Sequence, residues 1–489
     1  MMTERRFSDE EVAALFERAA AAEHATPRPV AASSGMTLAA LQDIGREVGI
    51  EPELVGRRAK NGGALLTATM NLRRVLAWSL AAAFLTTAVA CTPAAEQAIT
   101  AATAPQPNPH AGDSIGSVRE IYDGVLTPEL AVNTFRNIDR LFPTRVVTRS
   151  ANPLPLPPAD AVFDSVTTTY RGESYTLDQF IELNRVAGLL VLQDGRVRLE
   201  RYLLGNTDRT RWMSMSIAKS ITSTLIGAAV KEGRITAITD PVTKYVPSLA
   251  GSAYDGASVR DVLMMSSGAQ WSETYTNPAS DRRRLLEAQI SRTPGSAMEV
   301  MKSLPRAADP GTKNTYNTGE TQVAAEIVRN AVGTSLSAYL GERIWSKVGM
   351  EADANWWLDS PDGVEIGGSG FSATLRDYGR FGLFMLGGGI AGGEAILPDG
   401  WVAEATSPKM LAGRTGPVPL DYGYLWWTGT SATDRRDHAF GAEGIHGQFI
   451  YVNPAAKIVI VIWSARPRPS GGAVVDEWAF FDAVVSALR

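Results

Sequence analysis

Apolar residues form two pairs of short runs that have the pattern of β-hairpins. In the first pair, a dense aliphatic run at 187–193 and an alternating run at 196–202 flank Asp194-Gly195. An Asp-Gly dipeptide between two such runs is a strong signal for a two-residue hairpin turn. In the second pair, runs at 449–452 and 458–463 flank Asn-Pro-Ala-Ala-Lys. The pattern predicts two antiparallel hairpins that lie far apart in the sequence.

Between the hairpins, the spacing of apolar residues changes to that of helices. Ile217 and Ile221 begin an apolar stripe at every fourth position, and Gly233 follows it as a C-terminal helix stop. The stretch 235–430 has the pattern of helices and loops, and 474–488 has the spacing of an amphipathic helix. The sequence therefore predicts an α/β (α+β) fold. Its antiparallel sheet is built from N- and C-terminal strands and flanked by helices, with an inserted, mainly helical region.

Residues 1–69 have the pattern of three short, Ala-rich helices and carry no recognisable chemistry. Helices this short bury little apolar surface. They are interpreted as a small helical segment of unknown role. The alternative is an over-extended start, with Met70 as the true first residue.

The segment 70–91 has the layout of a secretory signal peptide. Arg73 and Arg74 precede an uncharged apolar run at 75–90, and small residues lead to Cys91, the single cysteine of the chain. This layout resembles a lipoprotein signal and predicts lipidation of Cys91. An uncleaved membrane anchor through 75–90 and plain secretion are the alternatives. All three place the remainder of the chain outside the cytoplasmic membrane. Lipidation, the favoured interpretation, predicts a membrane-tethered lipoprotein of the cell envelope on the periplasmic or extracellular face.

The remaining sequence divides into a linker and a globular domain. Residues 92–115 are rich in Thr, Ala, Pro and Gly and predict a flexible linker, and 116–489 is the predicted globular domain. The net charge is −5 and there is no basic stripe, which excludes nucleic acid as a partner. Zinc and nucleotide motifs are missing from the sequence, so we expect neither a metal nor another cofactor.

Ser216-Ile-Ala-Lys219 places a hydroxyl and an amine three residues apart at the start of a predicted helix. Positions i and i+3 share a helix face, so the two side chains point the same way. A serine beside a lysine at a helix N-terminus is a plausible activated nucleophile. The alternative interpretation is a common tetrapeptide on a solvated helix.

Histidine-based hydrolysis has little support in the sequence. Of the 4 histidines, His438 and His446 lie in the predicted globular domain, whereas His110 lies in the predicted linker. The Gly-x-Ser-x-Gly at 112–116 follows no strand, so we interpret it as a chance match. A lysine base must then be neutral near pH 7, which requires a pKa shift of roughly three units, or about 4 kcal/mol. Burial supplies a shift in that direction.

Two later stretches could complete such a site. Tyr316 lies in a Pro- and Gly-marked loop before a helix, and a phenol near a lysine can pass protons to a leaving group. Its alternative interpretation is packing under the loop. The Gly-rich entry to the C-terminal hairpin, 441–448, leaves backbone N–H groups exposed for an oxyanion. Its alternative is a bulge or a tight strand entry.

Ser216-x-x-Lys219, Tyr316 and Gly444-Ile445-His446-Gly447, in this order, resemble the serine β-lactamase and penicillin-binding-protein superfamily, with its β-lactamase/transpeptidase-like fold. Within it, the chain is most similar to the class C-like branch, especially 6-aminohexanoate-dimer hydrolases and related esterases. The resemblance covers about 117–488. Supporting stretches are 261–268, 271–275, 354–358, 367–371 and 376–383.

This resemblance implies a serine hydrolase that acts on a small-molecule ester or amide without a cofactor. Ser216 would be the acylated nucleophile, Lys219 would take its proton, and Tyr316 would relay protons with Lys219. The backbone N–H groups of Ser216 and Ile445 would form the oxyanion hole. The residues implied as the lining of the substrate pocket are Trp271, Glu273, Tyr275, Asn317 and His446.

The chain departs from the β-lactamase pattern at two motifs. Tyr316-Asn317-Thr318 stands where β-lactamases have Tyr-x-Asn, and Ile445-His446-Gly447 occupies the Lys-Thr-Gly position. Arg414-Thr415-Gly416 imitates the second motif but is followed by Pro417, so we interpret it as a loop. These departures favour an esterase or small-amide hydrolase. The alternatives are a D-Ala-D-Ala carboxypeptidase or β-lactamase, and a catalytically weak or inactive envelope-tethered binding or sensory protein.

Overall fold

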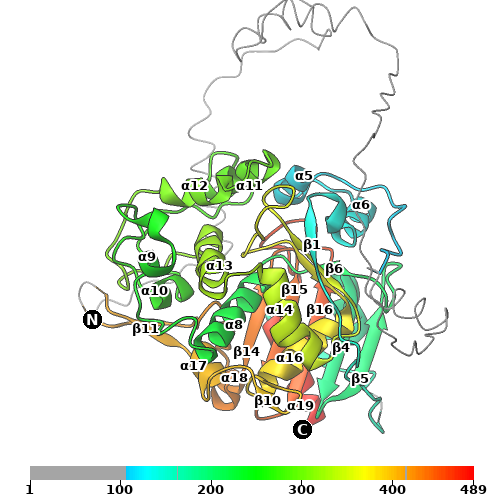
Figure 1. Cartoon of the computed structure of the whole chain (residues 1–489). Coiled ribbons are helices and arrows are strands. Elements are labelled where there is room, and N and C mark those ends of the chain that lie inside the picture. The colour runs from blue at the N-terminus through cyan, green and yellow to red at the C-terminus, as the bar shows by residue number, and fades with distance from the viewer. Residues whose placement is uncertain (1–105, 162, 414–415) are drawn as a thin grey trace, which may run out of the picture. The chain divides into compact units, whose positions relative to one another are not determined.

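The computed structural model describes residues 106–161, 163–413 and 416–489 (Figure 1). The chain divides into two units, Met1–Thr92 and Pro93–Arg489. The predictions for residues 1–69 and for the segment 70–91 with Cys91 fall outside the described residues and stay predictions. Within the described ranges, no helix has the length and apolar character needed to cross a membrane.

A six-stranded antiparallel sheet forms the centre of the described domain, with the strand order β13-β14-β15-β16-β4-β5. Strand β16 pairs with β4, so that Val461 lies opposite Leu190 and the two ends of the chain share one sheet. The predicted hairpins and the predicted sheet are thereby confirmed. The strands are β4 Val186–Gln193, β5 Arg196–Tyr202, β13 Trp427–Thr428, β14 Phe440–Gly444, β15 Gln448–Asn453 and β16 Ile458–Ser464.

Helices cover both faces of this sheet, which explains the dense apolar runs of β4 and β16. On one face, Leu190 and Val459 pack against α16 (Leu375–Leu386). A Cβ on Gly382 would lie 2.4 Å from Val459 Cγ1, so glycine in α16 permits this close approach. On the other face lie α7 (Leu177–Leu183) and α19 (Glu477–Leu488), whose Phe180 and Phe480 stack at 3.9 Å between ring centroids.

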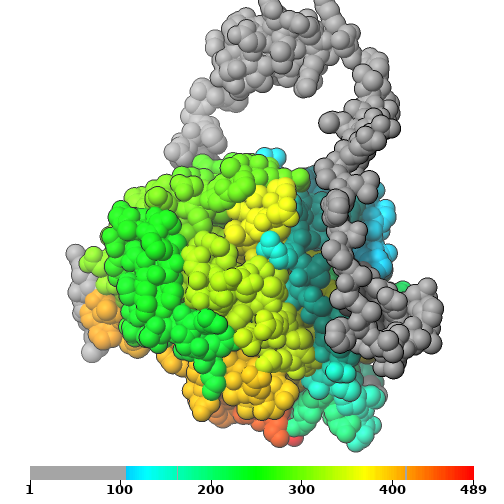
Figure 2. Space-filling model, viewed as in Figure 1, coloured from blue at the N-terminus to red at the C-terminus, as the bar shows by residue number. Residues whose placement is uncertain are grey.

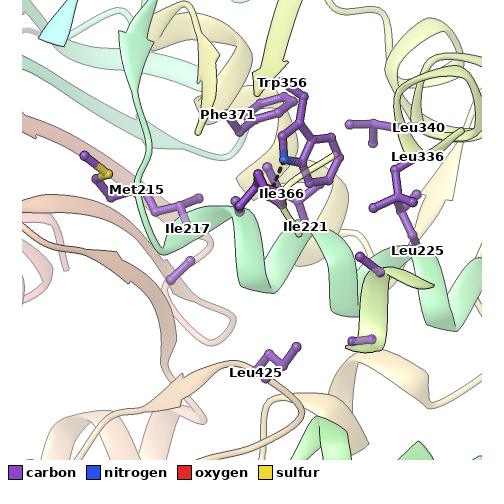
Figure 3. Packing of buried hydrophobic residues seen from close by; sticks show 14 of the residues in the cluster. Met215, Ile217, Ile221, Leu225, Leu336, Leu340, Trp356, Ile366, Phe371 and Leu425 are labelled. Carbon is purple, nitrogen blue, oxygen red and sulfur yellow. Dashed lines mark hydrogen bonds between the residues drawn. The ribbon is translucent and has the colours of Figure 1, made fainter. Parts of the chain in front are cut away.

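Helix α8 (Ile217–Lys231) lies against the α16 side of the sheet and is buried over nearly its whole length. Figure 3 shows Ile221 and Leu225 pointing toward Trp356 and Leu336, while Leu425 lies on the opposite side of the helix. Helix α8 is therefore buried on two sides, and the predicted apolar stripe is one of them. The helix ends at Lys231, and Gly233 follows at the predicted C′ position with a left-handed φ of 69°.

The inserted region is mainly helical, as predicted. In the space-filling view, its first part forms the green surface at the upper left (Figure 2). Its first helices are α9 Val242–Tyr245, η2 Pro247–Leu249, α10 Val259–Leu263, α11 Asp281–Ile290 and α12 Ser296–Lys302. They are followed by α13 Thr318–Val332, α14 Leu336–Leu340, η3 Gly341–Trp345, α15 Ser346–Val348, α17 Trp401–Ala405 and α18 Ala432–Asp437.

Smaller sheets and helices surround these layers, and the sequence pattern did not reveal the sheets. A four-stranded sheet has the order β1-β7-β8-β6, with β1 Thr144–Val147, β6 Trp212–Met213, β7 Ala354–Trp357 and β8 Phe371–Ala373. Short two-stranded ladders are β2 Thr167–Tyr170 with β3 Glu173–Thr176, β9 Ile390–Ala391 with β10 Glu394–Ala395, and β11 Lys409–Leu411 with β12 Val418–Leu420. The N-terminal helices are α5 Val118–Asp123, α6 Pro128–Phe135 and η1 Ile138–Arg140.

The prediction of a flexible linker does not hold for residues 106–115. Asn108 Nδ2 donates a hydrogen bond to the carbonyl of Arg136 at 3.0 Å, and His110 Nε2 lies 2.7 Å from Thr210 Oγ1. Asp113 forms a 2.7 Å ion pair with Arg136. These polar side chains fix the segment to the domain, an effect that its Pro- and Gly-rich composition does not reveal. The packed domain therefore begins before residue 116.

Candidate active site

Ser216 lies at the end of a tight turn between β6 and α8. The Ser214 backbone N–H donates to the Phe371 carbonyl at 2.8 Å, which ties the turn to β8. Met215 has a φ of 45°, an unfavourable left-handed conformation for a residue with a side chain. Ser216 follows at the N-cap position and is 9% exposed. The turn thus fixes the serine hydroxyl at the buried start of a helix.

Lys219 lies beside Ser216, as their helical spacing predicts. Its Nζ is 2.7 Å from Ser216 Oγ and donates to the Gly368 carbonyl at 3.0 Å. Burial, opposed by the Glu273 charge and reinforced by the Arg282 charge, lowers the pKa of Lys219 to about 7. A substantial fraction of this amine is therefore neutral near pH 7 and able to accept a proton.

Tyr316 faces the same pair from the loop before α13. The Nζ of Lys219 lies 5.2 Å from the centroid of the Tyr316 ring. Trp427 stacks on Tyr316 at 5.7 Å, and Tyr422 packs against its edge at 6.4 Å. Burial raises the pKa of Tyr316 and the nearby Glu273 raises it further, while a hydrogen bond to Ser216 opposes the rise. The phenol therefore stays protonated at neutral pH and can act as a donor.

The end of β14 passes close to the turn at Ser214–Ser216. A Cβ on Gly444 would lie 2.2 Å from the Ser214 carbonyl oxygen and 3.2 Å from the Ser216 nitrogen, so glycine is required there. Among the described residues, no acceptor takes the backbone N–H of Ser216 or of Ile445. This arrangement leaves two candidate donors for a negatively charged oxygen.

Glu273 joins the Trp271 loop to the start of α13. Its Oε2 accepts hydrogen bonds from Trp271 Nε1 at 2.5 Å and from the Thr318 backbone N–H at 2.9 Å. The positive end of the dipole of α13 also stabilises a carboxylate at this position. Tyr275 is half-buried, with its ring 6.2 Å from that of Tyr122. Because Glu273 influences the pKa values of both Lys219 and Tyr316, it belongs to the same local cluster.

The structure does not support the predicted substrate contacts of Asn317 and His446. Asn317 is 1% exposed, and its Oδ1 accepts the backbone N–H of Glu320 at 3.0 Å, which makes it the N-cap of α13. His446 is 2% exposed, its Nδ1 lies 2.8 Å from the Arg466 carbonyl oxygen, and burial lowers its pKa to about 4. Its ring packs 5.0 Å from Phe135. Both side chains are held in capping or packing contacts within the protein.

Several residues near Ser216 and Lys219 were not predicted from the sequence. The carbonyl of Gly368 binds Lys219, but a backbone acceptor has no signal of its own in a sequence. Tyr422 and Trp427 flank Tyr316, and the local density of aromatic residues at 422–427 was an available signal. Arg282 is buried against the face of Tyr122, 4.4 Å from the ring centroid, and lowers the pKa of Lys219.

Within the described part of the chain, no cluster of His, Cys, Asp or Glu side chains could hold a metal ion. The groups gathered at Ser216 are a hydroxyl, an amine, a phenol and backbone N–H groups. These are the groups that acyl transfer requires: a nucleophile, a base, a proton donor and an oxyanion stabiliser.

This combination of fold and site is that of a serine hydrolase. The chain matches the family model described as Beta-lactamase over residues 178–484, and it belongs to that family. It is 33% identical to the 6-aminohexanoate-dimer hydrolase of Paenarthrobacter ureafaciens over 378 residues, which cover 72% of this chain and 91% of that protein. The predicted superfamily is therefore confirmed.

One solved structure supports the fold. A protein described as a 6-aminohexanoate-dimer hydrolase from Bacillus anthracis aligns with a TM-score of 0.65 at 23% identity, over 79% of this chain and 98% of that one.

Proposed function

We propose that this hydrolase works through an acyl-enzyme on Ser216, with Lys219 as its base. The observation that carries the proposal is the 2.7 Å separation of Lys219 Nζ and Ser216 Oγ at a buried helix start. In the acylation step, Ser216 Oγ attacks the carbonyl carbon of the substrate while its proton passes to Lys219. The leaving amine or alcohol then receives a proton through Lys219 and Tyr316. Water enters by the reverse route and releases the acid.

The developing oxyanion would be held by the backbone N–H groups of Ser216 and Ile445. Donors that are fixed before reaction need no reorganisation when charge develops, and one such donor is typically worth about 10²–10³ in rate. Gly444, which precedes Ile445, packs closely against the Ser216 nitrogen. This contact supports the assignment, because it keeps the N–H groups of Ser216 and Ile445 near each other.

The proposed substrates are linear amides of the 6-aminohexanoate type and small esters. The supporting observation is the identity of 33% with a 6-aminohexanoate-dimer hydrolase, spread over 91% of that relative. The residues Ile445-His446-Gly447 at the Lys-Thr-Gly position lack a lysine that would hold the carboxylate of a β-lactam. This favours an open-chain amide or ester over an antibiotic.

Turnover of a matched substrate panel tests this proposal. The panel contains the linear 6-aminohexanoate dimer, p-nitrophenyl butyrate, a chromogenic cephalosporin and a peptide ending in D-Ala-D-Ala. We expect kcat/KM for the dimer or the butyrate ester to exceed that for the cephalosporin by at least about 10²-fold, which corresponds to about 3 kcal/mol. A preference for the cephalosporin or for D-Ala-D-Ala would contradict the substrate class. Inertness toward all four would favour the catalytically inactive binding protein.

Gly444→Ala is expected to lower kcat for the preferred substrate by about 10²-fold, because the new Cβ pushes Ile445 away from Ser216. Gly441→Ala is the matched control on the same strand. Its Cβ would meet its nearest neighbour, the Ile450 carbonyl oxygen, at 3.3 Å, so small shifts accommodate it. Steady-state kinetics should separate the two variants, and thermal unfolding of each checks that it is folded. Equal kcat values for Gly444→Ala and Gly441→Ala would show that the Ile445 N–H is not part of the oxyanion hole.

We also propose that the enzyme works in the cell envelope, tethered through lipidated Cys91. The signal-like layout of 70–91 supports this location.

A further inference from the structure

The Ile445 backbone N–H, one of the two proposed oxyanion donors, lies in a tight turn between β14 and β15. The Gly447 backbone N–H donates to the Gly444 carbonyl at 3.2 Å and closes this turn around Ile445 and His446. His446 has a φ of 66°, and Gly447 has a φ of 87°. A non-glycine residue in this conformation is strained and persists only where the surrounding structure fixes it. The position of the Ile445 N–H therefore depends on the contacts that hold the turn.

Arg466 holds the second half of this turn at three points. Its backbone N–H donates to the His446 carbonyl at 3.4 Å, and its own carbonyl accepts the Nδ1–H of the His446 ring at 2.8 Å. Its guanidinium fills the space beside Gly447, where a Cβ would lie 2.3 Å from Arg466 Nε. Glycine at this position thus lets a charged side chain pack directly against the backbone of the turn.

The first turn of α19 fixes Arg466 in turn. Arg466 Nη2 forms a 2.9 Å ion pair with Glu477 Oε1, and both side chains are buried. Asn184 Nδ2 donates to the same carboxylate oxygen at 3.2 Å. A buried guanidinium is costly unless a carboxylate compensates its charge. Glu477 therefore determines where the Arg466 side chain lies.

The next residue of α19 holds the first half of the turn. Trp478 Nε1 donates to Glu443 Oε1 at 2.8 Å. Glu443 is the penultimate residue of β14 and lies two residues before Ile445. The Trp478 ring also packs edge-on against Tyr451 of β15, at 5.6 Å between ring centroids. Two consecutive residues of α19 thus hold the chain before and after Ile445.

We propose that Glu477 and Trp478 are positioning residues for the oxyanion hole. They act through the side chains that they bind, which fix the turn that carries the Ile445 N–H. Their roles rest on the acyl-enzyme proposed at Ser216. An oxyanion forms both when the serine is acylated and when water removes the acyl group. A displaced donor therefore lowers kcat and leaves KM nearly unchanged.

Glu477→Gln and Trp478→Phe test these roles. The first removes the charge of the ion pair and the second removes the indole N–H. Hydrolysis of p-nitrophenyl butyrate is measured at about pH 8.5, because burial, opposed by the Arg466 charge, raises the pKa of Glu477 to about 7 and its carboxyl is ionised there. We expect each variant to lower kcat at least about tenfold and to change KM by less than about threefold. Trp478→Phe breaks no ion pair, so it decides the test if Glu477→Gln proves unstable.

Inhibition by n-butylboronic acid gives a readout that a merely structural role would not move. Ser216 Oγ adds to the boron and passes its proton to Lys219, and a boron-bound oxygen takes the place of the oxyanion. The inhibition constant should rise in both variants by about the factor by which kcat falls. Glu200→Gln is the matched control, because Glu200 forms a 2.6 Å ion pair with Arg376 from β5, at the opposite edge of the sheet from β13. This control should keep the wild-type kcat and inhibition constant.

The rates are referred to the fraction of enzyme that a fluorophosphonate labels, and thermal unfolding checks each fold. Wild-type kcat and inhibition constants in Glu477→Gln and Trp478→Phe would overturn this proposal and leave the proposed function standing. An equal loss in Glu200→Gln would do the same, because the effect would then follow from general destabilisation. Calorimetry separates the other failure. If Ser216→Ala bound n-butylboronic acid as tightly as the wild type, the acyl-enzyme at Ser216 would be contradicted, and the positioning roles with it.

Discussion

Ser216→Ala is expected to abolish covalent labelling by a fluorophosphonate and to lower kcat for ester hydrolysis by at least about 10⁴-fold. The alanine side chain has no oxygen to attack the carbonyl, so the acyl-enzyme cannot form. Lys219 and Tyr316 stay in place, but a base without its nucleophile leaves only the weak rate that binding and the N–H donors provide. Intact-mass spectrometry measures the labelling, and p-nitrophenyl butyrate release measures the rate.

Ser114→Ala is the matched control for this experiment. Ser114 occupies the Gly-x-Ser-x-Gly at 112–116 and is exposed, without the strand–turn–helix context of a nucleophile elbow. We expect this variant to be labelled and to turn over ester as the wild type does. Labelling that survives in Ser216→Ala and disappears in Ser114→Ala would show that Ser114 is the nucleophile. Labelling that survives in both variants would place the reactive group elsewhere.

The sheet could be predicted from the sequence because its signals are local. Asp194-Gly195 adopts φ values of 51° and 75°, the two left-handed conformations that a two-residue turn requires. The pairing of β4 with β16 is not local, but both runs are dense in aliphatic residues and need covering on two faces. The sheet of β1, β6, β7 and β8 escaped prediction, because its strands are only two to four residues long and gain their pairing from distant segments.

In the candidate site too, some residues are positioned by local sequence and others by contacts with distant segments. Ser216 and Lys219 share one helical turn, so their spacing alone brings the two side chains together. His446 depends on a left-handed φ of 66° and on a backbone hydrogen bond to the Pro469 carbonyl. Those contacts turn its ring into the protein and cannot be inferred from a Gly-rich motif. The acceptor role of Gly368 likewise requires the fold.

Lys219→Met is expected to lower kcat/KM for the ester substrate by about 10²–10⁴-fold, the usual contribution of a positioned general base. Methionine fills a similar buried volume but cannot accept the Ser216 proton. The pH profile gives a second readout. Because burial lowers the pKa of Lys219 to about 7, wild-type kcat/KM should rise with pH up to about 7 and then level off. The variant should lose this limb of the profile.

Stability gives a third readout, with a defined direction. The pKa of Lys219 is about 7 in the folded protein and about 10.4 when unfolded, so the unfolded chain binds more protons between these values. The free energy of unfolding of the wild type therefore gains a contribution from Lys219 that rises with pH across this window. Below about pH 7 the cost of the buried ammonium is fully present. Lys219→Met should then be more stable than the wild type by a few kcal/mol, and this advantage should shrink toward pH 10.

Lys244→Met is the control that tests whether these effects are specific to Lys219 or follow from the loss of any lysine. Lys244 also lies over a tyrosine ring, at 5.4 Å from the centroid of Tyr245, but it is exposed and paired with Asp240. We expect its removal to change kcat/KM less than about threefold and to leave the pH profile intact, because exposed ion pairs contribute little. Urea unfolding at pH 6 and pH 9 measures the stability difference. If Lys219→Met kept the wild-type rate and pH profile, another group would have to be the base, and the role of Lys219 would reduce to packing beneath Ser216.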